Sequence, residues 1–514
     1  MYMKNRSIIN NLPIQDFNIL LARFGLEKTW YSVLATHLLN IGRKDLEYIL
    51  KEKEFKNIEI QSFDFLKGLS VGEISVLYEY SLAHVDRDKR KEEGQYFTPD
   101  DVAQIMAKKA LTFPKNKIWI DPCSGVGNLS FWLIQYQENQ EDFLKKNIYL
   151  IDRDELALFI ARFILTIKFQ KKDLRLFKNI ISHFVKADFL FSDNLPKYDY
   201  AILNPPYVVT EPDTHFETSQ AKDLYAYFIE RVIKTTSGFI SITPQTFTNG
   251  QKFNSLRKLL LDNFNSLDIY CFDNVPDNIF KGIKFGSKNT NRANSTRAGI
   301  IIAKQSNNKQ VFRITPLLRW RVKERQKLLV SLDDFLVRIE PSEDLFPKLQ
   351  KNLLPLYRFV KNQKKILLHL VSNRPTPYKL IIPSTPRYFI SALKHPVKRS
   401  SYKILYFYSQ KEMDIAYLLL NSSYMYWWWR VNDGGMTISE KTLLTLPVLN
   451  EIMVNKSLLT KIEMSEKTNR VIKRNAGKDN ENVKHGSLLI QEITANLLPR
   501  FANALGLSHH NSVF

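Results

Sequence analysis

The stretch that decides the fold is IWIDPCSGVGNLSFW, residues 118–132. An apolar run leads into Asp121, then into Gly125 and Gly127, and then into a segment with helical spacing. Glycines at a strand-to-helix turn let a ligand approach the backbone, and the N–H groups at the start of the helix attract anions. The third glycine of the dinucleotide-binding fingerprint is absent, because Ser130 stands in its place. The stretch predicts a ligand-binding turn in an α/β domain, with a plain structural turn as the alternative.

Around this stretch, short apolar runs alternate with helix-like segments as far as about residue 304. Strands are expected at 117–122, 147–152, 198–206, 238–244, 267–272 and 298–304. Helices are expected between several of them, for instance at 155–169 and 224–235. This alternation predicts βαβ units and a mainly parallel sheet with helices on both faces.

The flanking regions differ from this α/β pattern. Apolar spacing of three and four over 16–40 and 45–55 predicts helices, and the charged segment 86–94 predicts a boundary. Beyond about residue 310 the chain is rich in Lys, Arg, Pro and aromatic residues. The expected parts are an N-terminal helical region at 1–90, an α/β domain at 91–305, a C-terminal α+β domain at 306–455, and a polar helical tail at 456–514 with a weak linker at 475–486.

The composition points to a polyanionic partner. The 514 residues include 74 Lys and Arg against 52 Asp and Glu, a formal net charge of +22. Nucleic acid is therefore favoured over a merely solvated basic surface, and a membrane surface is the weaker alternative. Only 2 cysteines exclude a disulfide scaffold and a Cys-rich zinc site. Without a signal-peptide core or an apolar run of about 20 residues, a cytoplasmic location is the default expectation.

Two acidic positions follow the next apolar runs. Asp152 ends the run NIYLID, where a carboxylate is expected to accept hydrogen bonds from a ribose. The alternative is a surface carboxylate that caps the following helix. Asp188 and Phe189 lie beside a further apolar run, and together they suit an adenine amino group and the face of its ring.

The strongest motif is YDYAILNPPYVVT, residues 198–210. Two prolines end the strand and hold the backbone extended, which leaves the Asn204 amide and the Pro205 carbonyl as rigid acceptors. Tyr207 adds a flat ring for stacking. Two acceptors and a ring at the carboxyl end of a strand suit the exocyclic amine of a planar base.

These motifs resemble the S-adenosylmethionine-dependent DNA N6-adenine methyltransferases of restriction–modification systems, in the class whose target-recognition domain comes last. The resemblance is good over about 94–304 and looser over 385–450. It implies a Rossmann-like class I methyltransferase domain with a mainly parallel seven-stranded sheet, followed by an α+β target-recognition domain. It also implies S-adenosylmethionine as cofactor, double-stranded DNA as substrate and a site without metal. A cognate restriction endonuclease would be the partner protein. We expect the protein to be a monomer.

The resemblance assigns roles to single residues. GQYFTPDDVAQIMA (94–107) matches the family's first cofactor segment, so Thr98 is expected to contact the methionine carboxylate. Cofactor contacts are expected from Thr98, Asp121, Pro122, Cys123, Gly125, Gly127, Asp152, Asp188, Phe189 and Phe228. The expected catalytic residues are Asn204, Pro205, Pro206 and Tyr207. Phe280, with Phe285 close by, is expected to join Tyr207 against the target base, and Leu129 departs from the family's usual aromatic residue.

The implied reaction begins with rotation of the target adenine out of the duplex. Asn204 and the Pro205 carbonyl would accept the two amino hydrogens and align the nitrogen with the sulfonium methyl. Transfer is then an in-line displacement that depends mostly on positioning.

The rest of the chain is read as a DNA surface. The segments 319–325 and 373–389 interleave cations, prolines and aromatic rings, which suits a surface that follows phosphates and touches base edges. Phosphate contacts are expected from Lys284, Lys288, Arg292 and Arg297, with a solvated loop as an equally good interpretation. The aromatic block 424–429 is expected to be a core helix rather than a wedge between bases.

Three other functions remain open from the sequence. The same catalytic motif occurs in methyltransferases that act on protein glutamine or RNA, but those are generally compact, whereas about 200 mostly basic residues follow the α/β domain of this chain. A fused restriction–modification enzyme would need clustered carboxylates and a lysine after strands, which residues 1–90 lack. A non-catalytic DNA-binding module is disfavoured by the intact catalytic and glycine motifs.

Overall fold

The computed structural model describes residues 12–85, 98–280, 296–306, 310–386, 389–433, 437–450, 452–475 and 478–510. The chain forms two compact units. Unit 1 comprises Met1–Phe247, Gln251–Phe312 and Arg325–Ser331, and unit 2 comprises Thr248–Gly250, Arg313–Glu324 and Leu332–Phe514. The expected N-terminal region thus shares a unit with the α/β domain, and the expected tail shares a unit with the region before it.

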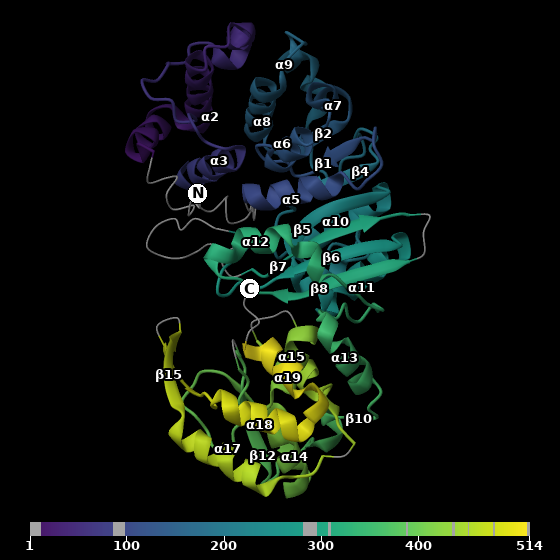
Figure 1. Ribbon diagram of the computed structural model, residues 1–514. Helices are drawn as coiled ribbons and strands as arrows, with labels where there is room; N and C mark the ends of the chain where they lie inside the picture. Colours follow the sequence, from purple (N-terminus) through teal and green to yellow (C-terminus); the bar gives the residue numbers. More distant parts are fainter. Residues whose placement is uncertain are drawn as a thin grey trace. The chain divides into compact units, whose positions relative to one another are not determined.

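The core of unit 1 is a mainly parallel sheet (Figure 1). Its strands are β1 (Trp119–Asp121), β2 (Ile148–Asp152), β3 (Phe184–Lys186), β4 (Tyr200–Leu203), β5 (Gly238–Pro244), β6 (Ser266–Phe272) and β7 (Ala298–Lys304). Among the described residues, these seven follow the order β3-β2-β1-β4-β5-β7-β6, with only β7 antiparallel to its neighbours. This arrangement confirms the expected class I methyltransferase sheet, and its buried apolar strands reflect helices on both faces.

Helices connect and cover these strands. They are α5 (Asp100–Ala110), α6 (Asn128–Gln135), α7 (Gln140–Lys146), α8 (Glu155–Phe169), α9 (Leu176–Asn179), α10 (Leu224–Thr235), α11 (Asn254–Asn263) and α12 (Arg325–Val330). Helix α8 begins where expected because the Asp154 side chain accepts hydrogen bonds from Leu156 N and Ala157 N. Short 3-10 turns η3 (Ile181–His183), η4 (Ser219–Ala221), η5 (Gln245–Thr248) and η6 (Gln251–Phe253) complete the connections.

The glycine turn between β1 and α6 has a physical requirement at each glycine. Gly127 has a φ of +82°, and a Cβ there would lie 3.1 Å from Ala161 Cβ and 3.3 Å from Leu150 Cδ2. This glycine therefore permits close packing of α6 on α8 and β2. Gly125 has a φ of +50°, but a Cβ there would meet nothing within 4 Å. The two glycines of one motif thus serve different needs.

Within residues 12–85, the N-terminal region contains α2 (Ile14–Asn40), η1 (Lys44–Lys51), η2 (Lys53–Phe55) and α3 (Val71–Val85). The expected helix at 45–55 is instead two 3-10 turns. The buried side chains of η1 are Leu46 and Ile49, and their spacing of three suits a helix with three residues per turn. The segment 45–55 is too short for its apolar pattern to distinguish three residues per turn from 3.6.

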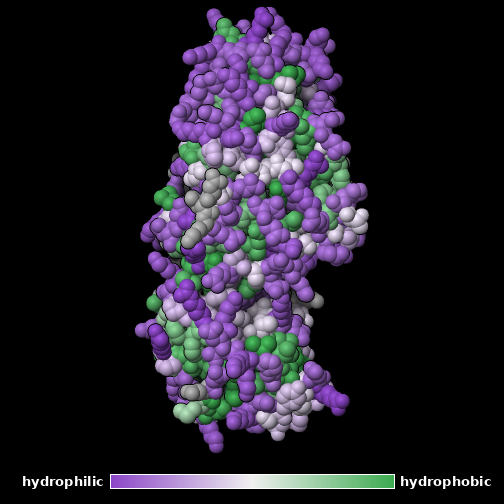
Figure 2. Space-filling model, turned by 90° about the vertical axis from the view of Figure 1, so that its right-hand side faces the viewer, coloured by the Kyte–Doolittle hydropathy of each residue, from purple (hydrophilic) through white to green (hydrophobic). Residues whose placement is uncertain are grey.

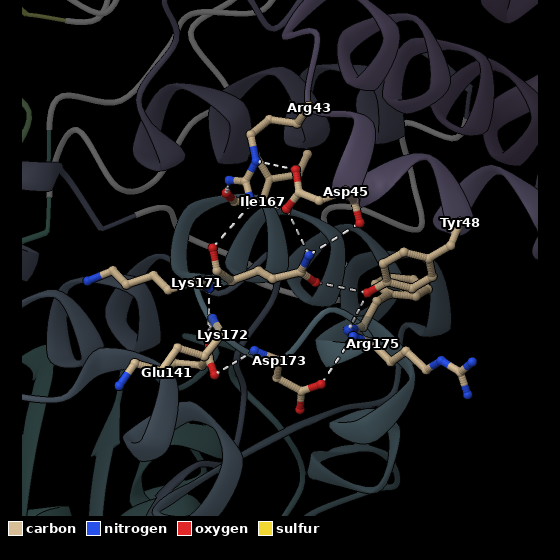
Figure 3. Close-up of polar contacts among 11 residues, drawn as sticks. Arg43, Asp45, Tyr48, Glu141, Ile167, Lys171, Lys172, Asp173 and Arg175 are labelled. Carbon is tan, nitrogen blue, oxygen red and sulfur yellow. Dashed lines mark hydrogen bonds and ion pairs between the residues drawn. The ribbon is translucent and has the colours of Figure 1, made fainter.

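A polar seam joins this region to the sheet domain (Figure 3). Gln170 is 3% exposed; its Oε1 accepts from the Tyr48 hydroxyl at 3.0 Å, and its Nε2 donates to Asp45 Oδ2 at 3.1 Å. Nearby, the Glu141 carboxylate accepts the backbone N–H groups of three successive residues, Lys171, Lys172 and Asp173. The bonds of Gln170 attach η1 of the N-terminal region to the segment after α8, and those of Glu141 hold the same segment against α7.

Unit 2 is an α+β assembly. Its strands are β9 (Val337–Arg338), β10 (Lys365–Ile366), β11 (Val371–Ser372), β12 (Lys379–Pro383), β13 (Tyr402–Phe407), β14 (Pro447–Val448), β15 (Arg470–Asn475) and β16 (Lys478–Val483), and the division between the units falls within β8 (Val311–Leu318). Its helices are α13 (Leu354–Lys361), α14 (Gln410–Leu420), α15 (Ser423–Asn432), α16 (Glu440–Leu444), α17 (Lys456–Thr468), α18 (Ser487–Leu497) and α19 (Ala502–His510). Its 3-10 turns are η8 (Val322–Glu324), η9 (Leu332–Phe335), η10 (Lys351–Leu353), η11 (Leu367–Leu370) and η12 (Pro499–Phe501).

The C-terminal segment departs from the expected separate tail. The predicted linker at 475–486 overlaps an antiparallel hairpin of β15 and β16. The final helices pack into unit 2: Thr494 Oγ1 accepts from Ser423 N at 3.0 Å, and His509 stacks on Tyr426 with ring centroids 4.1 Å apart. Polar residues obscured this packing in the sequence because the buried partners lie about 70–90 positions away.

The aromatic block is a core helix, as expected. Helix α15 buries Tyr424, Tyr426, Trp427, Trp428 and Trp429.

Figure 2 shows a mostly hydrophilic face on which hydrophobic side chains are interspersed. Among the described helices, none is both long and apolar enough to cross a bilayer.

Candidate active site

A cavity of about 210 Å³ lies in unit 1 at the carboxyl ends of β1, β2, β3 and β4. Open α/β sheets bind ligands at this edge. The predicted site residues that line the cavity are Thr98, Asp121, Pro122, Cys123, Gly125, Asp152, Asp188, Phe189, Asn204, Pro206 and Phe228. Gly127, Pro205, Tyr207 and Phe280 do not line it. Eleven of the predicted residues, from six separate segments, therefore meet around one space.

Asp121 is the most deeply buried acid of the cavity. Its Oδ2 accepts from the Ser130 hydroxyl at 2.9 Å, whereas its Oδ1 is buried without a hydrogen-bond partner among the described residues. Burial raises the pKa of Asp121 to about 7, and the neighbouring charge of Asp152 acts in the same direction. A cationic ligand group at Oδ1 would relieve both the missing hydrogen bond and the cost of ionisation.

Asp152 is held by the glycine turn. Its Oδ2 accepts the backbone N–H of Gly125 at 2.8 Å, and its Oδ1 accepts that of Asp154 at 3.0 Å. Burial raises the pKa of Asp152 to about 6, although these hydrogen bonds oppose the shift. The carboxylate is thus fixed in orientation and can accept further hydrogen bonds from a ligand.

The far end of the cavity is apolar and aromatic. Phe189 and Phe228 stack with ring centroids 5.6 Å apart and an interplanar angle of 25°. Asp188 accepts from the backbone N–H of Leu190 at 3.0 Å and lies 3.7 Å from the guanidinium of Arg153. Flat rings beside a carboxylate are the surroundings that a purine ring with an amino group requires.

The catalytic motif extends from β4 to the cavity edge. Asn204 Nδ2 donates to Thr98 Oγ1 at 3.0 Å, and Asn204 Oδ1 lies 2.8 Å from the hydroxyl of Tyr207. The Tyr207 hydroxyl also lies 2.9 Å from the carbonyl of Ile242 on β5. The ring of Tyr207 meets Phe280 edge-on, with centroids 5.9 Å apart. The structure therefore brings together Thr98, Asn204, Tyr207 and Phe280, although 182 positions separate the first from the last.

The loop after the motif is also fixed. Thr210 N donates to Lys222 O at 3.1 Å, and Leu224 N donates to Val208 O at 2.9 Å. These backbone bonds tie the motif to the start of α10, which carries Phe228. The amide and the aromatic end of the cavity are thus positioned by one continuous piece of structure.

Sequence reasoning missed one wall of the cavity. Ser75, Tyr78 and Glu79 of helix α3 line it, although they belong to the N-terminal region. The sequence predicted a helical region at 1–90, but nothing in it showed what these helices cover.

The predicted phosphate contacts fare differently. Lys284, Lys288 and Arg292, together with the alternative ring Phe285, lie outside the described residues. Arg297 is 8% exposed, and its Nε donates to Asp273 Oδ1 at 2.8 Å. This internal ion pair is a correction to the expected phosphate contact, because a buried, paired guanidinium does not face a phosphate.

The basic segment 319–325 also differs from expectation. Arg319 and Trp320 in unit 2 are 2% and 0% exposed, and Arg325 in unit 1 is fully buried. The Arg325 guanidinium pairs with Asp101 and donates to two backbone carbonyls in unit 1. Only Arg321, Val322 and Lys323 of this segment are exposed, so most of it is structural.

The sheet order and strand-end cavity define unit 1 as a Rossmann-like class I methyltransferase domain. Residues 146–280 match the family model described as Eco57I restriction-modification methylase. The resemblance to restriction–modification DNA methyltransferases that the motifs predicted is confirmed by this match and by the relatives that follow.

Two curated relatives share this region. The type II methyltransferase M.PstI of Providencia stuartii is 26% identical over 215 residues, which span 39% of this chain and 42% of the relative. The type II methyltransferase M.VspI of Vibrio sp. (strain 343) is 29% identical over 202 residues, 37% of this chain and 46% of the relative. The chain thus matches less than half the length of either relative.

Among solved structures, the type IIG restriction endonuclease BpuSI aligns with 100% of this chain and 80% of its own, at 12% identity and a TM-score of 0.45. A likeness of this degree is too remote to indicate a shared function.

Proposed function

We propose that this protein transfers a methyl group from S-adenosylmethionine to N6 of an adenine flipped out of duplex DNA, as the modification enzyme of a restriction–modification system. The observation that carries the proposal is the Asn204 amide at the edge of the cavity that Asp121 and Asp152 line. It supports a reaction in which a planar amine meets a bound cofactor at the end of β4. The matched methylase family supports the same substrate class.

The residues around the cavity fit S-adenosylmethionine. Asp121 Oδ1, which has no hydrogen-bond partner in the described part of the chain, suits the ammonium of the methionine portion. The fixed carboxylate of Asp152 suits the ribose hydroxyls. Gly125 leaves open space where a Cβ would otherwise project. Phe189 and Phe228 suit the adenine of the cofactor. When bound, the cofactor supplies an electrophilic methyl group on a sulfonium.

Thr98 and Tyr207 hold the Asn204 amide in place. With the Pro205 carbonyl, its oxygen would accept the two hydrogens of the adenine amino group, which directs the nitrogen lone pair toward the methyl. The proline ring fixes the backbone of that carbonyl. The contribution of these residues is positioning, since displacement at a sulfonium needs no covalent enzyme intermediate.

Tyr207 and Phe280 would contact the ring of the target adenine. Contact of the Tyr207 hydroxyl with Ile242 O anchors the ring against the sheet. Stacking of a base on an aromatic side chain is worth about 1–3 kcal/mol, which offsets part of the cost of unstacking the base. The net charge of +22 supports attraction of the DNA backbone.

A methylation assay with labelled S-adenosylmethionine tests the proposal. Duplex DNA should accept the label, and mass spectrometry of the digested DNA should find N6-methyladenine. Labelling of RNA or protein alone would contradict the substrate class, and N4-methylcytosine would contradict the base.

Two further expectations can be tested alongside this assay. We propose a monomer, which light scattering should confirm at the mass of one chain, 60.2 kDa. We also propose a separate endonuclease as the partner. Magnesium-dependent cleavage of unmethylated duplex by this chain alone would favour a fused restriction–modification enzyme instead.

A further inference from the structure

We infer that helix α3 of the N-terminal region is a part of the cofactor site, and that Tyr78 is a positioning residue for the carboxylate of Asp152. The inference rests on the proposed use of the cavity for S-adenosylmethionine. It gives the N-terminal helices a role in binding, which neither the motifs nor the matched family segment at 146–280 covers.

The first observation is the place of Tyr78. It lines the cavity, is 4% exposed, and its hydroxyl donates to Asp154 Oδ2 at 2.6 Å. Asp154 in turn donates its backbone N–H to Asp152 Oδ1 at 3.0 Å. Tyr78 is therefore two hydrogen bonds away from the carboxylate that would hold the ribose.

The same aspartate also starts helix α8. Asp154 Oδ1 accepts from Leu156 N and Ala157 N, so its second oxygen, Oδ2, is the one that Tyr78 engages. The loop between β2 and α8 is thus held from both sides, by its own helix and by α3. Removing the hydroxyl would release one side and leave the helix cap intact.

The second observation is that α3 is itself firmly attached. Trp30 meets the Tyr78 ring edge-on at 5.4 Å and donates from Nε1 to Ser81 Oγ at 2.9 Å. At the start of the helix, Asp100 of α5 accepts from Ser70 Oγ at 2.6 Å and from the backbone N–H of Gly72 at 3.2 Å.

The attachment leaves little space. A Cβ on Gly72 would lie 2.5 Å from Asp100 Oδ2, and Asp100 Oδ1 also accepts from Trp132 Nε1 of α6 at 3.0 Å. Helix α3 is therefore held against α5 and α6 at one end and against the Asp154 loop further along. A helix held at both places is a rigid wall of the cavity.

The test compares two phenylalanine variants of the full-length protein. Tyr78→Phe keeps the ring against Trp30 and removes only the hydroxyl. Tyr80→Phe is the matched control, since its hydroxyl donates to Asn18 Oδ1 at 2.9 Å in the same region and it does not line the cavity. Titration calorimetry with S-adenosylhomocysteine should give a Kd about fivefold weaker for Tyr78→Phe and unchanged for Tyr80→Phe.

A second readout separates positioning from general loosening. An S-adenosylhomocysteine analogue without ribose hydroxyls should bind Tyr78→Phe and wild type about equally. In an Asp152→Asn background, Tyr78→Phe should add less than twofold, because the group it positions is already altered. In methylation assays the KM for the cofactor should rise while kcat and the KM for DNA stay unchanged.

The outcomes distinguish the two proposals. Absence of binding by the wild-type protein overturns the proposed function and this inference with it. Binding by the wild type with an unchanged Kd for Tyr78→Phe overturns the inference alone. An equal loss for the analogue without ribose hydroxyls also overturns it, since the role would then be only structural.

Discussion

The sequence contains two conspicuous aromatic segments, and the structure places them in opposite settings. Tyr207 belongs to a loop at the end of β4, where Asn204 and Pro206 line a cavity. The aromatic side chains of α15 lie inside unit 2, where the Tyr424 hydroxyl donates to the Pro447 carbonyl at 3.0 Å and Trp428 Nε1 donates to the Thr442 carbonyl at 3.2 Å. The loop after β4 borders a cavity that can hold a ligand, whereas the aromatic side chains of α15 fill the core of unit 2.

The difference shows what marks a site in this protein. Aromatic content is higher in α15, with five of ten residues, than in 198–210, with three of thirteen, yet the helix only fills a core. At the cavity, a buried carboxylate oxygen of Asp121 has no hydrogen-bond partner among the described residues, and the Asp152 carboxylate is fixed by backbone groups. In α15 the buried Trp427 Nε1 also has no partner among those residues, but it does not line that cavity. Strand ends that leave polar groups facing a cavity, rather than aromatic rings, distinguish the two regions.

The largest expected effect is at the catalytic amide. Asn204→Ala should lower kcat by about 10²–10³-fold or more, because the amide that orients the target nitrogen is lost. Unfolding temperature and DNA affinity should change little. Asn263→Ala is the control, since that side chain donates to Leu259 O one turn earlier, at the end of α11. Retained turnover in single-turnover assays of Asn204→Ala would remove the role assigned to it.

The converse substitution lies in α15. Trp429 is fully buried and meets Tyr426 edge-on at 5.7 Å. Trp429→Ala should cost about 3–5 kcal/mol of the free energy of unfolding of unit 2. Urea unfolding followed by tryptophan fluorescence measures this loss. The folded protein should still bind S-adenosylhomocysteine with the wild-type Kd, and a weaker Kd would break the proposed division between site and core.

A finer comparison is possible within the glycine turn. Gly127→Ala should cost about 1–3 kcal/mol of stability, since the new Cβ meets Ala161 and Leu150. Gly125→Ala suffers backbone strain alone and should cost less. Cofactor affinity should show the reverse order, because only Gly125 lines the cavity. Thermal unfolding measures the stability of both variants, and calorimetry measures their cofactor affinity. Equal losses of stability and of affinity in the two variants would contradict the separate roles of Gly125 and Gly127.

The smallest expected effect is a pH dependence of cofactor binding. Burial raises the pKa of Asp121 to about 7, so the carboxylate is mostly protonated at pH 6 and mostly ionised at pH 7.5. Affinity for the cationic cofactor should therefore rise by about eightfold over this range, in proportion to the ionised fraction of Asp121. Asp121→Asn should bind more weakly and lose most of the dependence. An unchanged profile in this variant would assign the titration to another group, such as Asp152.

The same pKa has a consequence for stability. Because the native state holds the proton of Asp121 more tightly than the unfolded chain, the stability it contributes is present at low pH and is lost as pH rises through about 7. Asp121→Asn should remove this loss, so the variant should unfold at a higher temperature than wild type at pH 8. A lower unfolding temperature would show that the charge is compensated in the fold.

Much of unit 1 was predictable because its local signals agree. The strand runs at 238–244 and 298–304 are almost wholly buried, so their apolar pattern is continuous and their bounds match the structure. Helices 155–169 and 224–235 also have the expected bounds. The glycines, prolines and acids of the site could be named because they lie after strands, where parallel topology brings them to one edge. Thr98, Phe228 and Phe280 were assigned only by the resemblance to a known family.

Other features depend on partners that the sequence does not show. The charge of Arg325 predicted an exposed position on a DNA-facing surface. Its guanidinium is instead buried against Asp101, 224 positions away. The polar segment that suggested a linker near 475–486 is paired as a hairpin. In each case the residue type was informative only once its neighbour in space was known.

The sequence alone determined the alternation of strands and helices along unit 1, the glycine turn and the catalytic motif, since these depend on local backbone chemistry and apolar periodicity. Only the tertiary structure decided that Tyr78 of the N-terminal region lines the cavity and that Arg297 pairs with Asp273. The physical reason is that burial and pairing arise between distant segments, whereas periodicity reports only that one face of an element is covered.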